Sequence, residues 1–350
     1  MIGVSLPSPA RSAAHAIVSA ETAWLEGPGK LVWRAEPMRN PAPDQIACET
    51  IASVISPGTE LAAWRGANPL RAGDPYPRVQ GYCNVAKALA VGEQVEGIAP
   101  GDRILTLQSH CSHFVCSAHD IYLRLDPDMD AAIVATSYLF HLGYNAVLRS
   151  GARAGHRVAV IGLGVLGLTS VAMAAMAGAE VYAVSDHQGP RAIAQESYGA
   201  RGAYARRDHQ GLMRALGPGA DIVILTTNGW EDFQLALDLA GQNAVIACLG
   251  FPGRGTEPGA FNPLAADPFY TKQLRIEAVG FSPLENDARG FARFNLRDNL
   301  GIIARSITGG ALDPAPLLSG VYPARHLEQA YADLAARKDG AITYWLDWTA

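Results

Sequence analysis

The sequence predicts an α/β plus β protein, in which a doubly wound parallel sheet lies between two segments of a β-rich part. Short runs rich in β-branched and aromatic residues, bounded by Gly or Pro, recur between residues 14 and 126. From residue 157, apolar strands alternate with helical patterns, which is typical of a parallel sheet covered on both faces. After residue 284 helical periodicity returns, and a last strand follows at 341–348.

The first part is expected to consist mainly of strands. They are predicted within residues 14–27, 30–38, 45–56, 84–105 and 113–126. The segment 57–80 is expected to form turns, because it holds Pro57, Pro69, Pro75 and Pro77. Residues 130–151 have helical periodicity, which predicts a helix that links the two parts.

The second part is expected to alternate between strands and helices. Strands are predicted at 157–164, 180–186, 221–229, 243–250 and 275–281. Helices are predicted at 165–178, 190–200, 231–241, 289–307 and 326–340.

Composition indicates a globular chain without a nucleic-acid partner. Of the 350 residues, 49% are hydrophobic and 17% charged, which excludes disorder. The net charge of −5 makes the chain mildly acidic, whereas proteins that bind nucleic acids usually carry a basic surface. The N-terminal residues lack the basic and apolar regions of a secretion signal. Residues 158–179 have membrane-spanning length, but glycines interrupt them, so we expect no membrane segment and a cytoplasmic protein.

The cysteines are expected to be ordinary thiols in a reducing compartment. There are five, an odd number, and they form no disulfide pattern. Cys111 and Cys116 lie near His110 and His113, yet their spacing matches no zinc ribbon or finger.

A glycine-rich turn predicts a dinucleotide site. Gly162, Gly164 and Gly167 form a Gly-x-Gly-x-x-Gly pattern between a predicted strand and a predicted helix. Gly162 permits the tight turn, Gly164 lets a pyrophosphate approach the backbone, and Gly167 lets the helix pack on the strand. The helix begins with Val165 and Leu166, whose free N–H groups would face the phosphates.

The next strand carries a signal for the choice of cofactor. Asp186 ends that strand, where a carboxylate can accept hydrogen bonds from an adenosine ribose and would repel a 2′-phosphate. The sequence therefore favours NAD(H) over NADP(H). The alternative is a surface Asp that caps the following helix. Arg191 lies near the adenine edge or is simply solvated.

Further cofactor contacts are expected where later strands end, since such sheets bind ligands at the carboxyl ends of their strands. The candidate residues for the nicotinamide side are Thr226, Thr227, Asn228, Leu249 and Gly250.

Four segments together resemble the medium-chain dehydrogenase/reductase superfamily, which includes the zinc alcohol dehydrogenases and quinone reductases. They are Pro-Gly-Thr-Glu-Leu at 57–61, residues 81–104, the Gly-Leu-Gly-Val-Leu-Gly turn at 162–167 and residues 327–348. The resemblance implies a Rossmann-type doubly wound parallel sheet inserted in a GroES-like β-rich catalytic domain. The GroES-like domain would comprise residues 1–139 and 286–350, and the Rossmann domain residues 140–285.

This sequence departs from the zinc-dependent members of that superfamily. Pro57 stands where they have a ligand Cys, Tyr82 where they have a ligand His, and Ser137 at the third ligand position. These residues do not form the N/S set that zinc requires. The four-Cys loop of their structural zinc is also missing. We therefore expect no zinc. The Pro-Gly-Thr-Glu variant resembles the hydroxyethyl-bacteriochlorophyllide dehydrogenase branch and other dehydrogenases of specialised metabolism.

Three residues are candidates for the chemistry. Thr59 matches the proton-relay Ser/Thr of the superfamily, or is an ordinary turn hydroxyl. Tyr82 would face the cleft as an acid/base or a substrate-binding donor, or would fill a cavity. His141 lies one helical turn after Ser137, so both would face the cleft, and His is the usual general acid/base near neutral pH. Alternatively, His141 packs near the cofactor or an interface.

Residues around the substrate are predicted from the same neighbourhoods. The substrate-binding candidates are Glu60, Cys83, Ser137 and His110, of which His110 is alternatively a solvated loop residue.

Three functions remain open from sequence. The first is a zinc-independent, NAD(H)-dependent oxidoreductase that interconverts a secondary alcohol and a ketone. The second is an NADPH-dependent C=C reductase of the enoyl or quinone type, against which Asp186 argues. The third is a non-catalytic dinucleotide-binding protein. The partner would be a small-molecule substrate, and the resemblance implies a homodimer.

Overall fold

A computed structural model describes residues 19–67, 74–254, 257, 261–284 and 294–350. Four expectations lie wholly or partly outside the described residues. They are the beginning of the first strand at 14–18, the turns at 68–73 with Pro69, the domain boundary at 285–286 and the beginning of the helix at 289–293.

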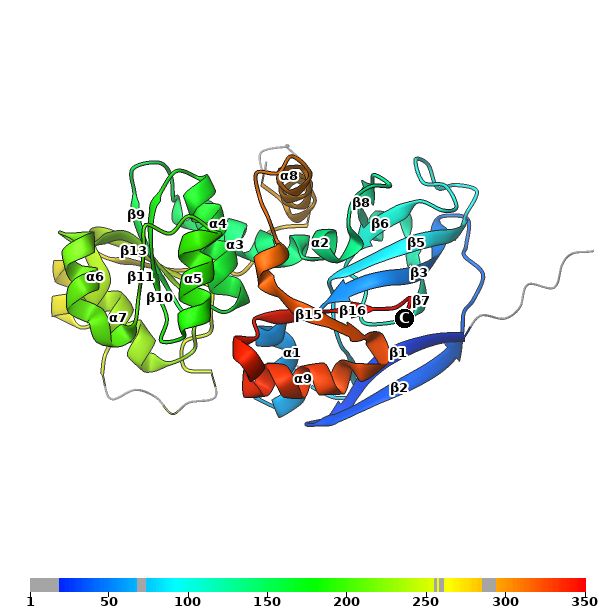
Figure 1. Cartoon of the computed structure of the whole chain (residues 1–350), viewed down its shortest axis with the longest axis horizontal. Coiled ribbons are helices and arrows are strands. Elements are labelled where there is room, and N and C mark those ends of the chain that lie inside the picture. The colour runs from blue at the N-terminus through cyan, green and yellow to red at the C-terminus, as the bar shows by residue number, and fades with distance from the viewer. Residues whose placement is uncertain (1–18, 68–73, 255–256, 258–260, 285–293) are drawn as a thin grey trace, which may run out of the picture.

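A six-stranded sheet, in which each pair of neighbours is parallel, occupies the middle of the chain (Figure 1). In spatial order its strands are β11 (Gly202–Tyr204), β10 (Glu180–Val184), β9 (Arg157–Ile161), β12 (Ala220–Leu225), β13 (Ala240–Cys248) and β14 (Arg275–Ala278). The helices between them are α4 (Val165–Met176), α5 (Gln188–Glu196), α6 (His209–Leu216) and α7 (Trp230–Leu239). The short strand β11 and helix α6 were not predicted from the sequence.

Both faces of this sheet are buried, as its uninterrupted apolar strands predict. In β9, Val158 and Val160 pack into one hydrophobic cluster, while Ala159 and Ile161 pack into another. Successive side chains of a strand point to opposite faces, so each face has its own core. Residues of α4 line the first cluster, and residues of α6 and α7 line the second. The segment 158–179 is thus the predicted strand, glycine turn and helix.

The β-rich part draws on both ends of the chain. Its seven-stranded sheet contains β15 (Leu318–Pro323), β16 (Thr343–Asp347), β3 (Gln45–Val54), β5 (Asn84–Val91), β6 (Arg103–Thr106) and β8 (Ile121–Leu125), with β7 (His113–Ser117) paired to β3. A smaller sheet contains β2 (Lys30–Pro37), β1 (Ser19–Gly27) and β4 (Arg78–Val79). The late helices are α8 (Leu296–Thr308) and α9 (Leu327–Ala336). The α/β plus β fold class is confirmed; the exact domain bounds stay a prediction.

The expectation of turns throughout 57–80 was wrong at its start, because α1 (Pro57–Arg65) is a helix. Pro57 occupies the beginning of the helix, where the missing N–H costs nothing and the fixed φ suits the first turn. Gly66, with φ +70°, ends the helix in the left-handed conformation. The prolines led to a prediction of turns, although one of them, Pro57, is the first residue of a helix.

The linking segment forms two helices instead of one, α2 (Ala131–Ala135) and α3 (Ser137–Ser150). The Thr136 hydroxyl donates to Ile133 O at 2.6 Å and marks the junction. Residues 131–150 are long and apolar enough to cross a membrane, but 72% of that stretch is buried inside the fold. Figure 1 shows α2 and α3 running between the two parts, as a core helix pair does.

Candidate active site

The glycine-rich turn leaves no room for side chains at two of its glycines. Gly162 has φ +88°, and a Cβ there would lie 2.4 Å from Thr227 Cγ2. A Cβ on Gly167 would lie 1.7 Å from Gly162 O, so α4 packs directly against the turn. These two glycines have the roles that the sequence pattern predicts, the tight turn and the close helix–strand contact.

Gly164 differs from both, because a Cβ there would meet nothing within 4 Å. Its backbone is extended and it precedes α4, where no side chain caps the helix. The first N–H groups of α4, from Val165 and Leu166, therefore lack a side-chain acceptor at an open surface. A pyrophosphate fits such a place, since it would supply acceptor oxygens and negative charge at a helix N-terminus.

The strand ends beside this turn are bound to it. The Thr226 hydroxyl donates to Ile161 O at 2.9 Å and to Gly162 O at 3.0 Å. Asn228 Oδ1 accepts the Phe251 N–H at 3.0 Å. A Cβ on Gly250 would lie 2.4 Å from Thr227 O, and Leu249 is buried. Thr226 and Asn228 thus hold the backbone of the site.

Two buried polar atoms near the expected nicotinamide have no hydrogen-bond partner in the part of the chain that the structure describes. They are Thr227 Oγ1 and His141 Nδ1. An unsatisfied buried polar group costs free energy unless a ligand or water completes it. Together with the open helix terminus, these atoms fit a dinucleotide.

Asp186 follows β10 as predicted, but it is not free. Its Oδ1 accepts the Arg206 N–H at 2.9 Å, and its Oδ2 accepts Arg206 Nη1 at 2.8 Å. The Arg206 guanidinium also bonds both oxygens of Asp232, at 2.6 and 2.9 Å. Hydrogen bonding to Arg206 lowers the pKa of Asp186, which is therefore ionised. Sequence analysis missed Arg206, because it follows the unpredicted strand β11.

Arg191 is partly buried. Its Nη1 donates to Ser185 O at 2.6 Å, so it holds the end of β10. Its place near the adenine edge stays a prediction. His187 Nε2 contacts Arg337 Nη1, at the end of α9. This contact joins the carboxyl edge of the six-stranded sheet to the β-rich part of the chain.

A pocket of about 240 Å³ lies in the β-rich part. Its lining includes Thr59 and Tyr82, together with Arg78, Gln80 and Gln108. Gln80 is buried, and its Nε2 has no partner among the described residues. Two of the three catalytic candidates therefore share one polar pocket, whereas Ser137 and His141 are not among its described lining residues.

The three positions aligned with metal ligands do not fit zinc. Pro57 begins α1 and has no donor atom, and the Ser137 hydroxyl donates to Val134 O at 2.6 Å. The Tyr82 phenol donates to Ser56 Oγ. Elsewhere in the described chain, no three His, Cys, Asp or Glu side chains are grouped to hold a metal ion. Neutral hydroxyls are poor partners for zinc, which prefers thiolate and imidazole.

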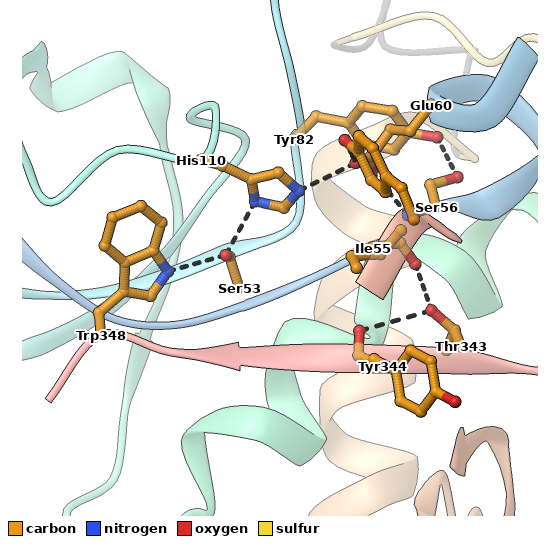
Figure 2. Close-up of polar contacts among 10 residues, drawn as sticks. Ser53, Ile55, Ser56, Glu60, Tyr82, His110, Thr343, Tyr344 and Trp348 are labelled. Carbon is orange, nitrogen blue, oxygen red and sulfur yellow. Dashed lines mark hydrogen bonds and ion pairs between the residues drawn. The ribbon is translucent and has the colours of Figure 1, made fainter. Parts of the chain in front are cut away.

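A buried polar network surrounds Glu60, which is also one of the residues that line the pocket (Figure 2). Glu60 Oε1 accepts the Ser56 N–H at 2.6 Å, while Oε2 accepts from His110 Nε2 at 2.9 Å and from the Tyr331 hydroxyl at 2.6 Å. Glu60 is 1% exposed and His110 is fully buried. The structure thus brings together two predicted substrate-side residues, both directed at each other within the fold.

His110 continues the network away from the pocket. Its Nδ1 lies 2.9 Å from Ser53 Oγ, which also accepts the Trp348 Nε1–H at 2.9 Å. A Cβ on Gly81 would lie 2.6 Å from the imidazole, so only glycine fits over the ring. Tyr331 and Trp348 were not identified from the sequence, because nothing in the local pattern near residue 331 or 348 points to residue 60.

Tyr82 stands between the pocket and this network. Burial raises the pKa of its phenol well above the usual value, as do Cys83 and Glu60, while hydrogen bonding with Ser56 and Thr59 opposes the shift. The phenol is therefore protonated at neutral pH and acts as a hydrogen-bond donor. Its ring packs edge-on against Tyr138, at 5.1 Å between centroids.

His141 and Cys83 have less reactive environments. Burial lowers the pKa of His141 to about 4, so its imidazole is neutral at physiological pH. The His141 ring lies 5.7 Å from that of Tyr138. Cys83 is fully buried, and burial together with Glu60 raises the pKa of its thiol, which opposes a thiolate role.

Known proteins of similar sequence and shape are dehydrogenases. A family model described as zinc-binding dehydrogenase matches residues 165–294. The 2-desacetyl-2-hydroxyethyl bacteriochlorophyllide A dehydrogenase of Cereibacter sphaeroides is 27% identical, with 93% of this chain and 97% of that protein covered.

Solved structures share the whole fold at lower identity. An oxidoreductase/dehydrogenase of unknown specificity from Escherichia coli has a TM-score of 0.79 at 17% identity, covering 94% of this chain and 99% of that one. A protein from Sinorhizobium meliloti 1021, solved with bound NADP, has a TM-score of 0.76 at 20% identity, with the same coverage. With the relative above, these findings support an oxidoreductase of the dehydrogenase type. The chain is thus similar, over most of its length, to proteins of the dehydrogenase type, as the resemblance to the medium-chain dehydrogenase/reductase superfamily implies.

Proposed function

We propose that this chain is a zinc-independent, NAD(H)-dependent oxidoreductase that interconverts a secondary alcohol and a ketone. The observation that carries the proposal is the pocket in which Thr59 and Tyr82 present two hydroxyl groups. Tyr82 occupies a position where zinc-dependent relatives are expected to have a metal ligand. At this position a side chain that donates a hydrogen bond thus replaces a side chain that would bind zinc.

The chemistry divides between cofactor and protein. A bound nicotinamide takes or gives the hydride, and the alcohol oxygen loses or gains a proton. During reduction, negative charge develops on the substrate oxygen, and donors aimed at it lower the barrier. The protonated Tyr82 phenol becomes such a donor when its O–H turns from Ser56 Oγ to the substrate oxygen, and the Ser56 hydroxyl then donates to the phenol oxygen. The Thr59 hydroxyl on the exposed side of α1 is a second donor. Neither role requires a metal.

The charges near the expected adenosine support NAD(H). Asp186 and Asp232 carry two negative charges against the one positive charge of Arg206, so this group has a net charge of −1. Each Asp186 oxygen accepts one hydrogen bond from Arg206 and retains capacity for ribose hydroxyls. A 2′-phosphate would meet the Asp186 carboxylate, of which 52% is exposed.

The sequence relative supports the reaction class. Its name describes dehydrogenation of a compound that carries a hydroxyethyl group, which is an alcohol. We infer an alcohol or ketone substrate for this chain as well, small enough to enter a pocket of polar character.

The test combines cofactor binding, metal content and one variant. Purified protein is titrated with NADH and NADPH by nicotinamide fluorescence, assayed for metals, and screened against secondary alcohols and ketones. We expect tighter NADH binding, well under one zinc per chain, and a fall in kcat of about 100-fold or more in Tyr82→Phe. Tyr270→Phe, at a residue 72% exposed, is the matched control.

Other outcomes would select the alternatives. A preference for NADPH with turnover of enones or quinones would indicate a C=C reductase. Cofactor binding without any turnover would indicate a non-catalytic protein. Stoichiometric zinc would contradict the interpretation of Pro57, Tyr82 and Ser137.

A further inference from the structure

The Glu60 carboxylate receives three donors while almost fully removed from water. These are the Ser56 N–H, His110 Nε2–H and the Tyr331 hydroxyl, at 2.6 to 2.9 Å. An ionised carboxylate only accepts hydrogen bonds, and this arrangement offers it only donors. A protonated Glu60 would place its own proton against one of them. The hydrogen-bond pattern therefore calls for a charged Glu60.

Assigning donors and acceptors in the same way gives the protonation state of His110. With Nε2–H donating to Glu60, a neutral imidazole has Nδ1 free to accept the Ser53 hydroxyl. Ser53 Oγ meanwhile accepts the Trp348 N–H, so every polar atom of the network is satisfied. A charged His110 would donate through Nδ1 and leave the Ser53 proton without an acceptor among the bonds described here. The network therefore carries one negative charge, on Glu60.

This network is not a proton wire. The Tyr82 phenol donates to Ser56 Oγ, but Ser56 reaches Glu60 through its backbone N–H. At the other end, Trp348 Nε1 is a donor only and cannot pass a proton onward. The hydrogen bonds join the pocket to a fixed charge, but they provide no continuous path for protons.

Several groups face this charge from the surrounding elements. They are Tyr82 and Cys83, which directly precede β5, His110 on the loop before β7 and Tyr331 on α9. Arg78 on β4 is a permanent cation that acts on Tyr331 and also lines the pocket. Tyr82 is the group that both faces Glu60 and lines the pocket with a hydroxyl.

We propose that Glu60 is the positioning residue of this site, fixing the beginning of α1 so that the Ser56 hydroxyl orients the Tyr82 phenol. Ser56 precedes α1, and Glu60 one turn later binds the Ser56 N–H, which locks this first turn. The Ser56 hydroxyl then contacts Tyr82. The proposal rests on the proposed function only where it assigns that phenol to the substrate oxygen.

The experiment measures the hydrogen bond of Tyr82 directly. The near-ultraviolet absorbance of Tyr82 at neutral pH is obtained in the wild type and in Glu60→Gln as the difference between each protein and its Tyr82→Phe version. Loss of the bond from the phenol to Ser56 Oγ moves the tyrosine band to shorter wavelength. We expect this shift in Glu60→Gln, because the new amide nitrogen cannot accept from His110 and Tyr331 and the side chain no longer holds the first turn of α1. The same Tyr82 band in both proteins overturns the proposal.

Two further variants separate the Ser56 bond from the rest of the network. Tyr331→Phe removes one donor to Glu60 but keeps the bond to the Ser56 N–H, so the Tyr82 band should stay near its wild-type position. Ser56→Ala keeps Glu60 and its backbone bond but frees the phenol. It should lower kcat at least tenfold with little change in the KM for NADH, which keeps the proposal open to refutation even if Glu60→Gln does not fold. An unchanged kcat in Ser56→Ala counts against the proposal.

Failure of the proposed function can be recognised separately. The absorbance measurement needs no substrate, so a shifted Tyr82 band in Glu60→Gln without turnover of any alcohol or ketone would uphold Glu60 and reject the reaction. Normal turnover in wild type with an unshifted band in Glu60→Gln would do the reverse.

Discussion

The cofactor edge of the six-stranded sheet and the polar network around Glu60 differ in how far apart in the sequence their parts lie. The cofactor edge is short-range, because Gly162, Gly164 and Gly167 lie within six residues and act through backbone conformation and close contact. The network is long-range: Tyr331 is 271 residues from Glu60, and Trp348 is 295 residues from Ser53. Of the three glycines in the first region only Gly164 is exposed, and the region is shaped by its backbone. The second region is buried and is made of side chains.

This difference explains how each region tolerates change. A site made from glycine backbone depends on the absence of side chains, so adding one methyl group at a glycine disrupts it. A site made from buried polar side chains depends on complete pairing, so removing one charge or donor leaves others unsatisfied. The largest effects are therefore expected from additions at the cofactor edge and from deletions in the network.

The strongest test of the cofactor edge compares two glycines three residues apart. Gly167→Ala would place Cβ 1.7 Å from Gly162 O and should lower Tm by about 5 °C or more. Gly164→Ala meets nothing within 4 Å and its extended backbone accepts alanine, so Tm should hardly change. Its methyl group would instead occupy the expected path of the pyrophosphate and weaken NADH binding about 100-fold, measured by fluorescence titration.

The comparison depends on whether Gly167→Ala lowers Tm while Gly164→Ala weakens NADH binding. If Gly164→Ala binds NADH as the wild type does, the pyrophosphate does not lie against this turn. If Gly167→Ala is as stable as the wild type, the backbone contact is not tight.

A second prediction concerns His141, which lies on α3 between the two regions. Burial lowers the pKa of its imidazole from 6.5 in the unfolded chain to about 4. The unfolded state thus takes up the proton first, so His141 stabilises the fold above pH 6.5 and that contribution is lost as pH falls toward 4. The free energy of unfolding relative to His141→Phe should drop by about 3 kcal/mol over this range.

Urea unfolding of both proteins between those pH values measures this drop. Phenylalanine keeps an aromatic ring beside Tyr138 but cannot titrate, so it serves as the matched reference. If the free energies of unfolding of the two proteins change with pH in parallel, His141 does not become charged on unfolding in this range.

Local pattern and long-range pairing also set what the sequence could predict. The glycine turn, the alternating strands and helices and Asp186 at the end of β10 depend on neighbours in the chain, and they were predictable. The partner of Asp186 was not, since Arg206 lies 20 residues away, beyond the unpredicted strand β11. His110 was considered a possibly solvated loop residue, and its burial depends on Glu60, Ser53 and Gly81, each from a different segment.

The α1 helix shows the same limit at close range. A cluster of prolines predicted turns, but the helix begins at Pro57 and is held by the bond from Ser56 N–H to Glu60. The roles of Thr59 and Tyr82 stay predictions, because they depend on where a substrate binds.

The smallest expected effect lies at Asp186, where charge is exposed. Asp186→Ser keeps a hydroxyl near the ribose and removes one of the two carboxylates that hold Arg206. The net charge of this group would change from −1 to 0, and Arg206 Nη1 could donate to a 2′-phosphate while Asp232 still holds Nε and Nη2. NADPH affinity should rise about tenfold and narrow the gap to NADH, by the same fluorescence titration. Asp44→Ser, on the β-rich part, is the matched control and should leave both affinities unchanged.

The modest size of this effect follows from solvent. The Asp186 side chain is 52% exposed and that of Glu60 is 2% exposed, so water and salt screen the first charge far more than the second. Raising the salt concentration should therefore shrink the Asp186→Ser effect on NADPH binding while leaving the Glu60→Gln effect on Tyr82 nearly unchanged. An Asp186→Ser effect that is absent at low salt would mean that the adenosine end of the cofactor is recognised elsewhere, and an effect that resists salt would mean that Asp186 is buried when the cofactor binds.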